Sequence, residues 1–296
     1  MTYQEKLRQE RIRKNRMTNK ILNILLVLFI LIFVGSASYL GYYFYKINQA
    51  ENDMNDVKSL ILTDEDIVSE EEIAETAQET EEASPYIDID GVSVLKKYSQ
   101  IYKSNKDFIG WLNIHDTKID YPVMYTPEDE QLYLRKNFSK EYSTAGTLFL
   151  AANSDPVEPS DNIIIYGHNM KAGTMFHTLL EYEDEEFYKA HKNIYFDTIY
   201  EKNTYEVIAA FRTVITDEDD SFKYYDFFEA ANEEEFNAYV ARAKELTPYN
   251  IDATASYGDK LLTLSTCAYH ADSGRYVVVA RRVVEDAEED SDDGLE

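Results

Sequence analysis

The heptapeptide Leu-Leu-Thr-Leu-Ser-Thr-Cys, from Leu261 to Cys267, decides how this chain is interpreted. An apolar run that ends in small hydroxyl residues predicts a buried β-strand that presents its last side chain at a surface. That side chain belongs to Cys267, the only cysteine among 296 residues, so it cannot form a disulfide within the chain. A single thiol in this position is either a buried space-filling residue or a nucleophile, and the rest of the chain must distinguish the two.

The N-terminal segment predicts where the protein resides. Residues 1–20 carry seven basic and two acidic residues, and residues 21–45 carry no charge. At ~1.5 Å per residue this uncharged stretch is long enough to cross the ~30 Å hydrocarbon core as a transmembrane helix. The basic flank predicts a cytoplasmic N-terminus, an extracellular remainder and a single membrane pass. A cleaved signal peptide is the alternative, because Gly35-Ser36-Ala37-Ser38 is similar to a cleavage site.

The charge distribution separates a compact domain from acidic flanks. The net charge of −27 argues against nucleic acid and against an anionic membrane surface as partners. Residues 46–85 form an acidic extracytoplasmic linker, and residues 285–296 form an acidic tail expected to be disordered. The compact domain is therefore expected over residues 86–284. Outside the cell it must fold without a disulfide, which favours a Gram-positive bacterium as the source.

The pattern of the compact domain is mainly β. A leading amphipathic helix is expected over residues 92–106, and a helix capped by Asn232 over residues 232–246. Short strands are expected over residues 109–114, 118–124, 147–150, 162–166, 194–198, 204–213, 260–266 and 275–284. Eight such strands predict a closed or nearly closed β-barrel decorated by helices. A doubly wound α/β sheet fits less well, because helices do not alternate with strands and no glycine-rich phosphate loop occurs.

A reactive cysteine needs a base and a charge stabiliser. Among five histidines, His168 follows an apolar run and Gly167, so it lies at a strand end as Cys267 does. A surface-loop histidine is the alternative for His168, and His270 is expected at the rim. Arg275 opens the strand after Cys267, and an antiparallel pair would put the two side by side. An edge salt bridge is the alternative for Arg275, whereas Arg281 and Arg282 at the far end should be structural or solvent-facing.

Three motifs together resemble the sortases, the membrane-anchored cysteine transpeptidases of Gram-positive bacteria. They are Thr263-Leu264-Ser265-Thr266-Cys267, Gly274-Arg275-Tyr276-Val277-Val278 and, upstream, Tyr166-Gly167-His168-Asn169-Met170. Further features resemble class B, namely Tyr121-Pro122-Val123, Gly146-Thr147-Leu148-Phe149, Thr174-Met175-Phe176, the leading helix and the helix inserted before the cysteine strand. The resemblance covers roughly residues 90–284 and implies an eight-stranded β-barrel, in agreement with the strand count.

The resemblance also implies roles for individual residues. Cys267 would be the nucleophile, His168 the acid and base, and Arg275 the oxyanion or substrate stabiliser. Class B members often carry an acidic residue directly after the cysteine, whereas this chain has Ala268. Any role of a carboxylate at that position is therefore not carried over.

Four residues are candidates for contact with the substrate. Ser265 shares a strand face with Cys267, because side chains alternate along a strand, and simple packing is its alternative. The other three candidates are Thr266, Asn169 and Tyr269. No cofactor and no metal are expected. The acidic run from Asp217 to Asp220 could hold Ca²⁺, but a solvated loop is the preferred interpretation.

The implied reaction cleaves a sorting motif after its Thr, near the C-terminus of a secreted protein. A thioacyl-enzyme forms, and an amine of a peptidoglycan precursor or of a pilin lysine then accepts the acyl group. Two alternatives stay open. One is a cysteine protease that transfers the acyl group to water, and the other is a membrane-tethered binding module with an inert thiol.

Overall fold

The computed structural model describes residues 2–63, 66–67, 84–216, 222–268 and 271–283. The acidic run from Asp217 to Asp220, residues 64–65 and 68–83 of the acidic linker, and the C-terminal tail lie outside these residues. The chain divides into two units, Met1–Glu51 and Asn52–Glu296. Each unit is described by itself.

The first unit is helical and belongs to α1 (Tyr3–Lys58). This helix contains a stretch that is long and apolar enough to cross a membrane, judged by length and composition. Large apolar side chains in that stretch are more than half exposed, among them Leu26, Phe29 and Phe33. Exposed apolar side chains on a helix of this length are typical of a lipid-facing segment.

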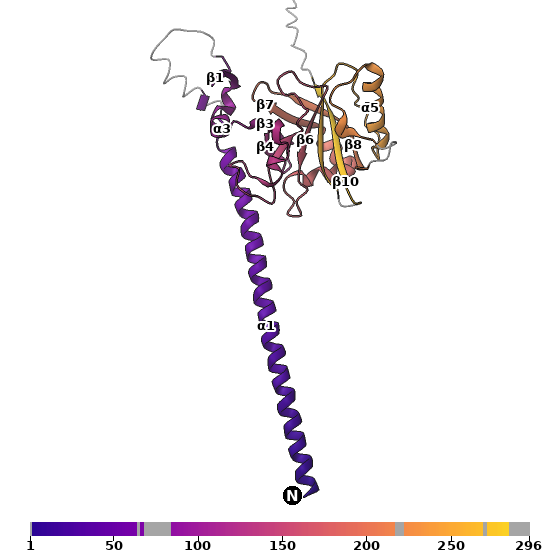
Figure 1. Ribbon diagram of the computed structural model, residues 1–296. Helices are drawn as coiled ribbons and strands as arrows, with labels where there is room; N and C mark the ends of the chain where they lie inside the picture. Colours follow the sequence, from indigo (N-terminus) through magenta and orange to yellow (C-terminus); the bar gives the residue numbers. More distant parts are fainter. Residues whose placement is uncertain (1, 64–65, 68–83, 217–221, 269–270, 284–296) are drawn as a thin grey trace, which may run out of the picture. The chain divides into compact units, whose positions relative to one another are not determined.

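The second unit is built around a closed β-barrel of eight strands, in the order β10-β8-β7-β3-β4-β5-β6-β9 (Figure 1). The strands are β3 (Phe108–Asn113), β4 (Asp120–Met124), β5 (Leu148–Leu150), β6 (Asn162–Gly167), β7 (Asn193–Thr198), β8 (Thr204–Val214), β9 (Leu261–Cys267) and β10 (Gly274–Val283). The contacts β4–β5 and β6–β9 are parallel and the other neighbours are antiparallel. The predicted closed, mainly β barrel is therefore confirmed.

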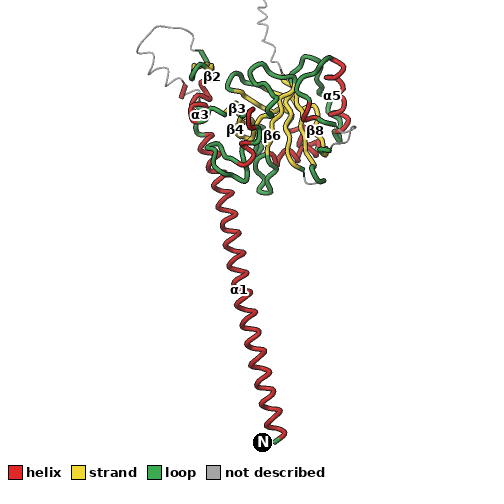
Figure 2. The backbone as a smooth tube through the Cα atoms, viewed as in Figure 1, coloured by secondary structure: helices red, strands yellow, loops and turns green. Residues whose placement is uncertain are grey.

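The long apolar runs of the sequence arise because both faces of several strands are covered. On β9, Leu262 and Leu264 belong to the main core cluster, whereas Leu261 belongs to a second cluster shared with α5 (Glu233–Leu246). On β10, Val277 and Val279 likewise pack in that second cluster. Figure 2 shows α5 alongside the strands. A strand buried on both faces reads as a continuous apolar run rather than as an alternation.

The inserted helix begins where the sequence predicts. The side chain of Asn232 accepts a hydrogen bond of 3.0 Å from the backbone N–H of Glu235, which satisfies one of the unpaired donors of the first turn. The remaining short helices are α3 (Ser99–Ser104), α4 (Glu185–Ala190), η1 (Lys96–Tyr98), η2 (Pro127–Asp129), η3 (Leu132–Arg135), η4 (Phe176–Glu183) and η5 (Tyr224–Asp226).

The leading helix is shorter than predicted. The prediction of a helix over residues 92–106 was wrong for its first part. There, β2 (Val92–Leu95) pairs with β1 (Tyr86–Ile89) in a hairpin. The turn residues Asp90 and Gly91 both adopt positive φ, 57° and 83°. Asp-Gly is a strong hairpin signal, and it outweighs the helical spacing of the apolar residues that follow it.

The second unit includes residues before the predicted start of the compact domain. Val57, near the end of α1, is buried, and the N–H of Leu62 donates to the carbonyl of Lys97 at 3.0 Å. Lys58 forms an ion pair with Asp120 on β4. A compact domain that starts at residue 86 therefore leaves out contacts that the unit beginning at Asn52 contains.

Candidate active site

Cys267 ends β9 directly opposite Arg275, the second residue of β10. The two strands are antiparallel, with Cys267 paired to Arg275 and Thr266 paired to Tyr276. Cys267 is half-buried, whereas the six residues before it on β9 are buried. The predicted side-by-side arrangement of the cysteine and the arginine is therefore confirmed. Ala268, which follows, is buried and donates its N–H to the carbonyl of Gly274 at 2.9 Å.

The strand that leads to His168 runs parallel to β9 on its other side. In that pairing Gly167 lies opposite Thr266, and the hydroxyl of Thr266 donates to the carbonyl of Gly167 at 2.8 Å. His168 comes directly after Gly167, and Cys267 comes directly after Thr266. The two side chains therefore lie on neighbouring segments at the same end of the barrel. This geometry depends on two strands that are separated by about a hundred residues of sequence.

A glycine is needed at position 167 because there is no room for a side chain, and not because the backbone adopts an unusual conformation. Its φ is not among the positive values, but a Cβ at this position would lie 2.7 Å from the ring of Phe176 and would also overlap Leu148. The N–H of Phe176 donates to the carbonyl of His168 at 2.9 Å. Close packing at Gly167 thus supports the segment that carries the histidine.

The His168 ring is oriented by a backbone carbonyl. Its Nε2 lies 2.8 Å from the carbonyl oxygen of Leu134, which can only accept, so Nε2 carries a proton and Nδ1 is left for proton exchange. Burial lowers the pKa of His168, the bond to Leu134 opposes this, and the positive charge of Arg135 lowers it further. Its pKa therefore lies below the usual value, and the neutral, basic form predominates at neutral pH.

Arg275 differs from the other arginines of β10. Within the described residues it forms no ion pair, and its guanidinium donates to the carbonyl of Gly274 at 3.0 Å. Its charge is near two phenols, because it acts to lower the pKa of both Tyr166 and Tyr224. Burial dominates and raises the pKa of Tyr224 to about 12. Arg275 thus lies beside the thiol and close to two buried phenols.

The hydroxyl groups next to the thiol are already engaged. Ser265 is 1% exposed, and its hydroxyl lies 2.7 Å from that of Tyr224 in η5. Thr266 is 2% exposed and bonds to Gly167. Both residues were predicted to contact substrate, and in this structure their side chains bind protein groups.

Asn169 lies beside Cys267, whereas the other candidates are dispersed. The amide of Asn169 donates to the carbonyl of Cys267 at 2.9 Å, and His177 bonds to the same amide. Tyr269 and His270 lie outside the described residues. His191 bonds to the carbonyl of Phe187 within α4, and His115 stacks on Tyr195.

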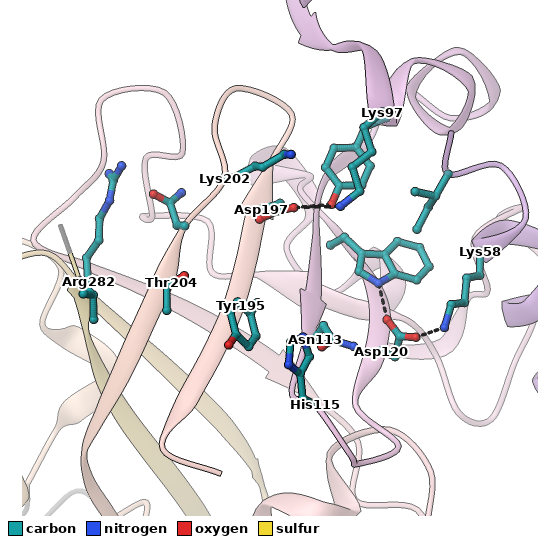
Figure 3. A pocket seen from close by; sticks show the side chains of 15 residues that line it. Lys58, Lys97, Asn113, His115, Asp120, Tyr195, Asp197, Lys202, Thr204 and Arg282 are labelled. Carbon is teal, nitrogen blue, oxygen red and sulfur yellow. Dashed lines mark hydrogen bonds and ion pairs between the residues drawn. The ribbon is translucent and has the colours of Figure 1, made fainter. Parts of the chain in front are cut away.

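A hollow of about 900 Å³ opens at the other end of the barrel, near Arg282 (Figure 3). Arg281 pairs with Leu261 at the start of β9, so this is the end opposite Cys267. Its carboxylates are matched by nearby cations. Asp197 binds Lys97 and the hydroxyl of Tyr98, and Asp120 binds Lys58 and the indole of Trp111. The hollow is therefore a place of internal ion pairing.

The family model of the sortase domain matches residues 112–283. This range contains the thiol, His168 and Arg275, together with all of the barrel strands from β4 to β10. More than half of the chain is therefore matched by a single family.

Named relatives extend the similarity. Sortase B of Listeria monocytogenes is 35% identical over 185 residues, which is 62% of this chain and 72% of the relative. Sortase B of Staphylococcus aureus is 31% identical over 190 residues, 64% of this chain and 75% of the relative. A solved structure described as a Staphylococcus aureus sortase B–substrate complex has a TM-score of 0.64 at 25% identity, covering 82% of this chain and 100% of that one.

Proposed function

The chain belongs to the sortase family of cysteine transpeptidases, class B-like, and we propose that Cys267, His168 and Arg275 carry its catalysis. The observation that carries this proposal is the strand register. Arg275 is paired with Cys267 on one side, and the segment of His168 lies beside the same strand end on the other. Strand ends are rigid supports, as catalysis requires of groups that must meet within hydrogen-bond reach.

In the first half of the reaction His168 acts as base and then as acid. Its lowered pKa keeps the imidazole neutral, and Nδ1 is the nitrogen that accepts the proton of the Cys267 thiol. The sulfur attacks the Thr carbonyl of the sorting motif and forms a tetrahedral intermediate. When the peptide bond breaks, the imidazolium returns the proton to the leaving amine, and a thioacyl-enzyme remains.

Arg275 stabilises the charge that develops on the carbonyl oxygen. Because it has no carboxylate partner within the described residues, its guanidinium donors are available to an oxyanion. The nearby phenols of Tyr166 and Tyr224 are kept neutral by burial, so they do not compete for the positive charge.

The second half of the reaction transfers the acyl group to an amine. Sortases act on proteins that carry a sorting motif and on amine acceptors, and one structural neighbour is described as a substrate complex. We propose that the acceptor here is an amine of a peptidoglycan precursor or of a pilin. The predicted contact of Ser265, Thr266, Asn169 and Tyr269 with substrate stays a prediction. In this structure Ser265 bonds to Tyr224 of η5, Thr266 bonds to Gly167 at the end of β6, and Asn169 bonds to Cys267.

The N-terminal helix supports a membrane-anchored enzyme. We propose that residues 1–20 are cytoplasmic, residues 21–45 span the membrane once, and the barrel lies outside the cell. Support comes from the apolar stretch of α1 and from the basic residues before it.

A transfer assay tests the proposed function. The soluble unit from Asn52 onward would be incubated with a library of Thr-containing sorting peptides and a saturating amine. We expect ligated product from the wild type and none from Cys267→Ala, and we expect a methanethiosulfonate reagent to modify Cys267 in the native fold. Release of free acid alone would indicate a protease instead, and a thiol that reacts only after denaturation would indicate a binding module.

A further inference from the structure

The segment between β6 and η4 folds back on itself directly after His168. Asn169 and Met175 form an isolated antiparallel bridge. The N–H of buried Met175 donates to the hydroxyl of Tyr121 at 3.2 Å, although Met175 adopts a positive φ of 56°. A non-glycine residue with positive φ persists only where several contacts hold it, so this return path is strongly determined.

Asn169 connects this segment to the nucleophile. It is 6% exposed, and its Nδ2 donates to the main-chain carbonyl of Cys267 at 2.9 Å. The bond joins the residue after His168 to Cys267 itself. It is therefore a direct link between the two catalytic strand ends, beyond the register of β6 and β9.

His177 completes the link from the first turn of η4. Its Nδ1 lies 2.7 Å from Oδ1 of Asn169. The carbonyl of Cys267 can only accept, so the amide nitrogen of Asn169 must face it, and the amide oxygen must face His177. His177 therefore donates from Nδ1. The orientation of the amide and the position of the imidazole proton are both determined by this chain of two bonds.

We propose that Asn169 and His177 form a positioning pair that holds Cys267 at the correct distance from His168. This inference rests on the proposed function, since it assigns the pair to the acyl-transfer reaction. The two bonds that define the pair end on protein atoms, so the role proposed for the pair is to fix the position of Cys267. A displacement of about 1 Å between reacting groups costs on the order of 10²-fold in rate.

The variants separate the donated bond from the bulk of the ring. His177→Leu removes the donor, whereas His177→Asn keeps an N–H near the place of Nδ1. Asn169→Asp keeps the size but directs a carboxylate oxygen at the carbonyl of Cys267, where a donor is needed. We expect kcat to fall on the order of 10- to 10²-fold in His177→Leu and Asn169→Asp with KM little changed, and to recover largely in His177→Asn.

The pH profile of thiol alkylation gives a readout that a structural defect would not change. We expect the iodoacetamide profile of Cys267 in His177→Leu to move toward that of His168→Ala, because the thiol and the imidazole are no longer held together. His191→Leu is the matched control, because His191 also donates from Nδ1 to one acceptor, the carbonyl of Phe187, and is remote in the fold. It should keep both the wild-type kcat and the wild-type profile.

The outcomes distinguish this inference from the proposed function. Wild-type kcat in both His177→Leu and Asn169→Asp would overturn the inference, as would equal losses in His177→Leu and His177→Asn. A loss of kcat with an unchanged alkylation profile would also overturn it, since the pair would then be only structural. Activity in Cys267→Ala would instead overturn the proposed function, whatever the result for His177.

Discussion

The two ends of the β9–β10 pair carry arginines in different electrostatic settings. At one end Arg275 lies opposite the thiol and, within the described residues, forms no ion pair. At the other end Arg281 binds Glu206 at 2.9 Å, and Arg282 makes two bonds to the carboxylate of Glu201, at 2.7 and 2.8 Å. The same strand thus holds two arginines in ion pairs and one that, in the part of the chain that the structure describes, has none.

Under the proposed function, this difference separates an end that performs chemistry from an end that supports the fold. A guanidinium that already binds a carboxylate has fewer donors left for a developing oxyanion, whereas one without an ion pair keeps them. The carboxylates that line the hollow at the far end are likewise engaged in ion pairs. Asp197 and Asp120 each bind a lysine (Figure 3).

The sharpest test of the comparison replaces one arginine from each end of β10 by alanine, in separate variants. Arg275→Ala should lower kcat by ~10²–10³-fold with little change in Tm, because a donor to the oxyanion is lost. Arg282→Ala should leave kcat unchanged and lower Tm by about 2–4 °C at most, because a partly exposed ion pair contributes about 0–1 kcal/mol. Steady-state kinetics and thermal unfolding of both variants decide the matter.

A lysine variant sharpens the result for Arg275. Arg275→Lys keeps the charge but loses the planar array of donors, so it should recover only part of the rate. Full recovery would mean that charge alone is required at this position. An equal loss of kcat in Arg275→Ala and Arg282→Ala would remove the distinction between the two ends.

Gly167 tests the packing that supports the catalytic end. In Gly167→Ala the new methyl group would lie 2.7 Å from the ring of Phe176, so the segment after His168 must shift. We expect a loss of about 1–3 kcal/mol in stability from overpacking and about a tenfold or larger fall in kcat/KM. Urea unfolding and peptide cleavage measure the two effects.

The control for Gly167 is Gly258, in the turn before β9. It has a positive φ of 99° and no atom within 4 Å of a Cβ. Gly258→Ala should lose about 1 kcal/mol through backbone strain alone and keep wild-type kcat/KM. If both variants lost activity equally, the effect would come from lowered stability rather than from the position of His168.

Much of the barrel could be predicted because its strands are bounded by turns and are apolar over their whole length. The strand expected over residues 260–266 differs by one residue at each end from β9, Leu261–Cys267. The hairpin of β1 and β2 could not be found from periodicity, because its strands are four residues long and their residues also fit a helical stripe. Only the Asp90-Gly91 pair signalled it.

The positions of the candidate residues were predictable where a side chain lies at a strand end, and not where a partner comes from a separate segment. His168 directly follows β6, and Arg275 lies at the start of β10. The carbonyl of Leu134 that orients His168 comes from a short helix 34 residues earlier, and backbone carbonyls leave no mark in the sequence. Tyr224 bonds to Ser265 across 41 residues of sequence and His177 to Asn169 across 8, and nothing in their local sequence indicates these partners.

At the far end, Asp120 should affect stability and not turnover. Burial raises the pKa of Asp120, but the bonds from Lys58 and Trp111 outweigh it, so the pKa lies below its usual value. Asp120→Asn should therefore lose about 1 kcal/mol at neutral pH. The stabilisation is present above the unfolded pKa of about 3.9 and is lost as pH falls through the folded value, so the two proteins should converge in acid.

Thermal unfolding at pH 7 and at pH 3 measures this convergence, and kcat at pH 7 provides the control. Lys58→Met should reproduce most of the loss, since it removes the cation that Asp120 binds. A constant difference in Tm across the pH range would contradict the ionic explanation. A fall in kcat would show that the far end is coupled to the catalytic end.

The smallest expected effect is a shift in the pH profile caused by Arg135. Burial and the charge of Arg135 both lower the pKa of His168, so the acid limb of kcat/KM should lie below about 6.5, the usual value for histidine. Arg135→Gln removes one of the two causes and should move the limb upward, toward that value, with little change in rate at pH 8. Arg135→Lys keeps the charge and should leave the limb in place. Arg135 also donates to the carbonyl of Thr144 at 3.1 Å, so equal shifts in both variants would assign the effect to that bond rather than to charge.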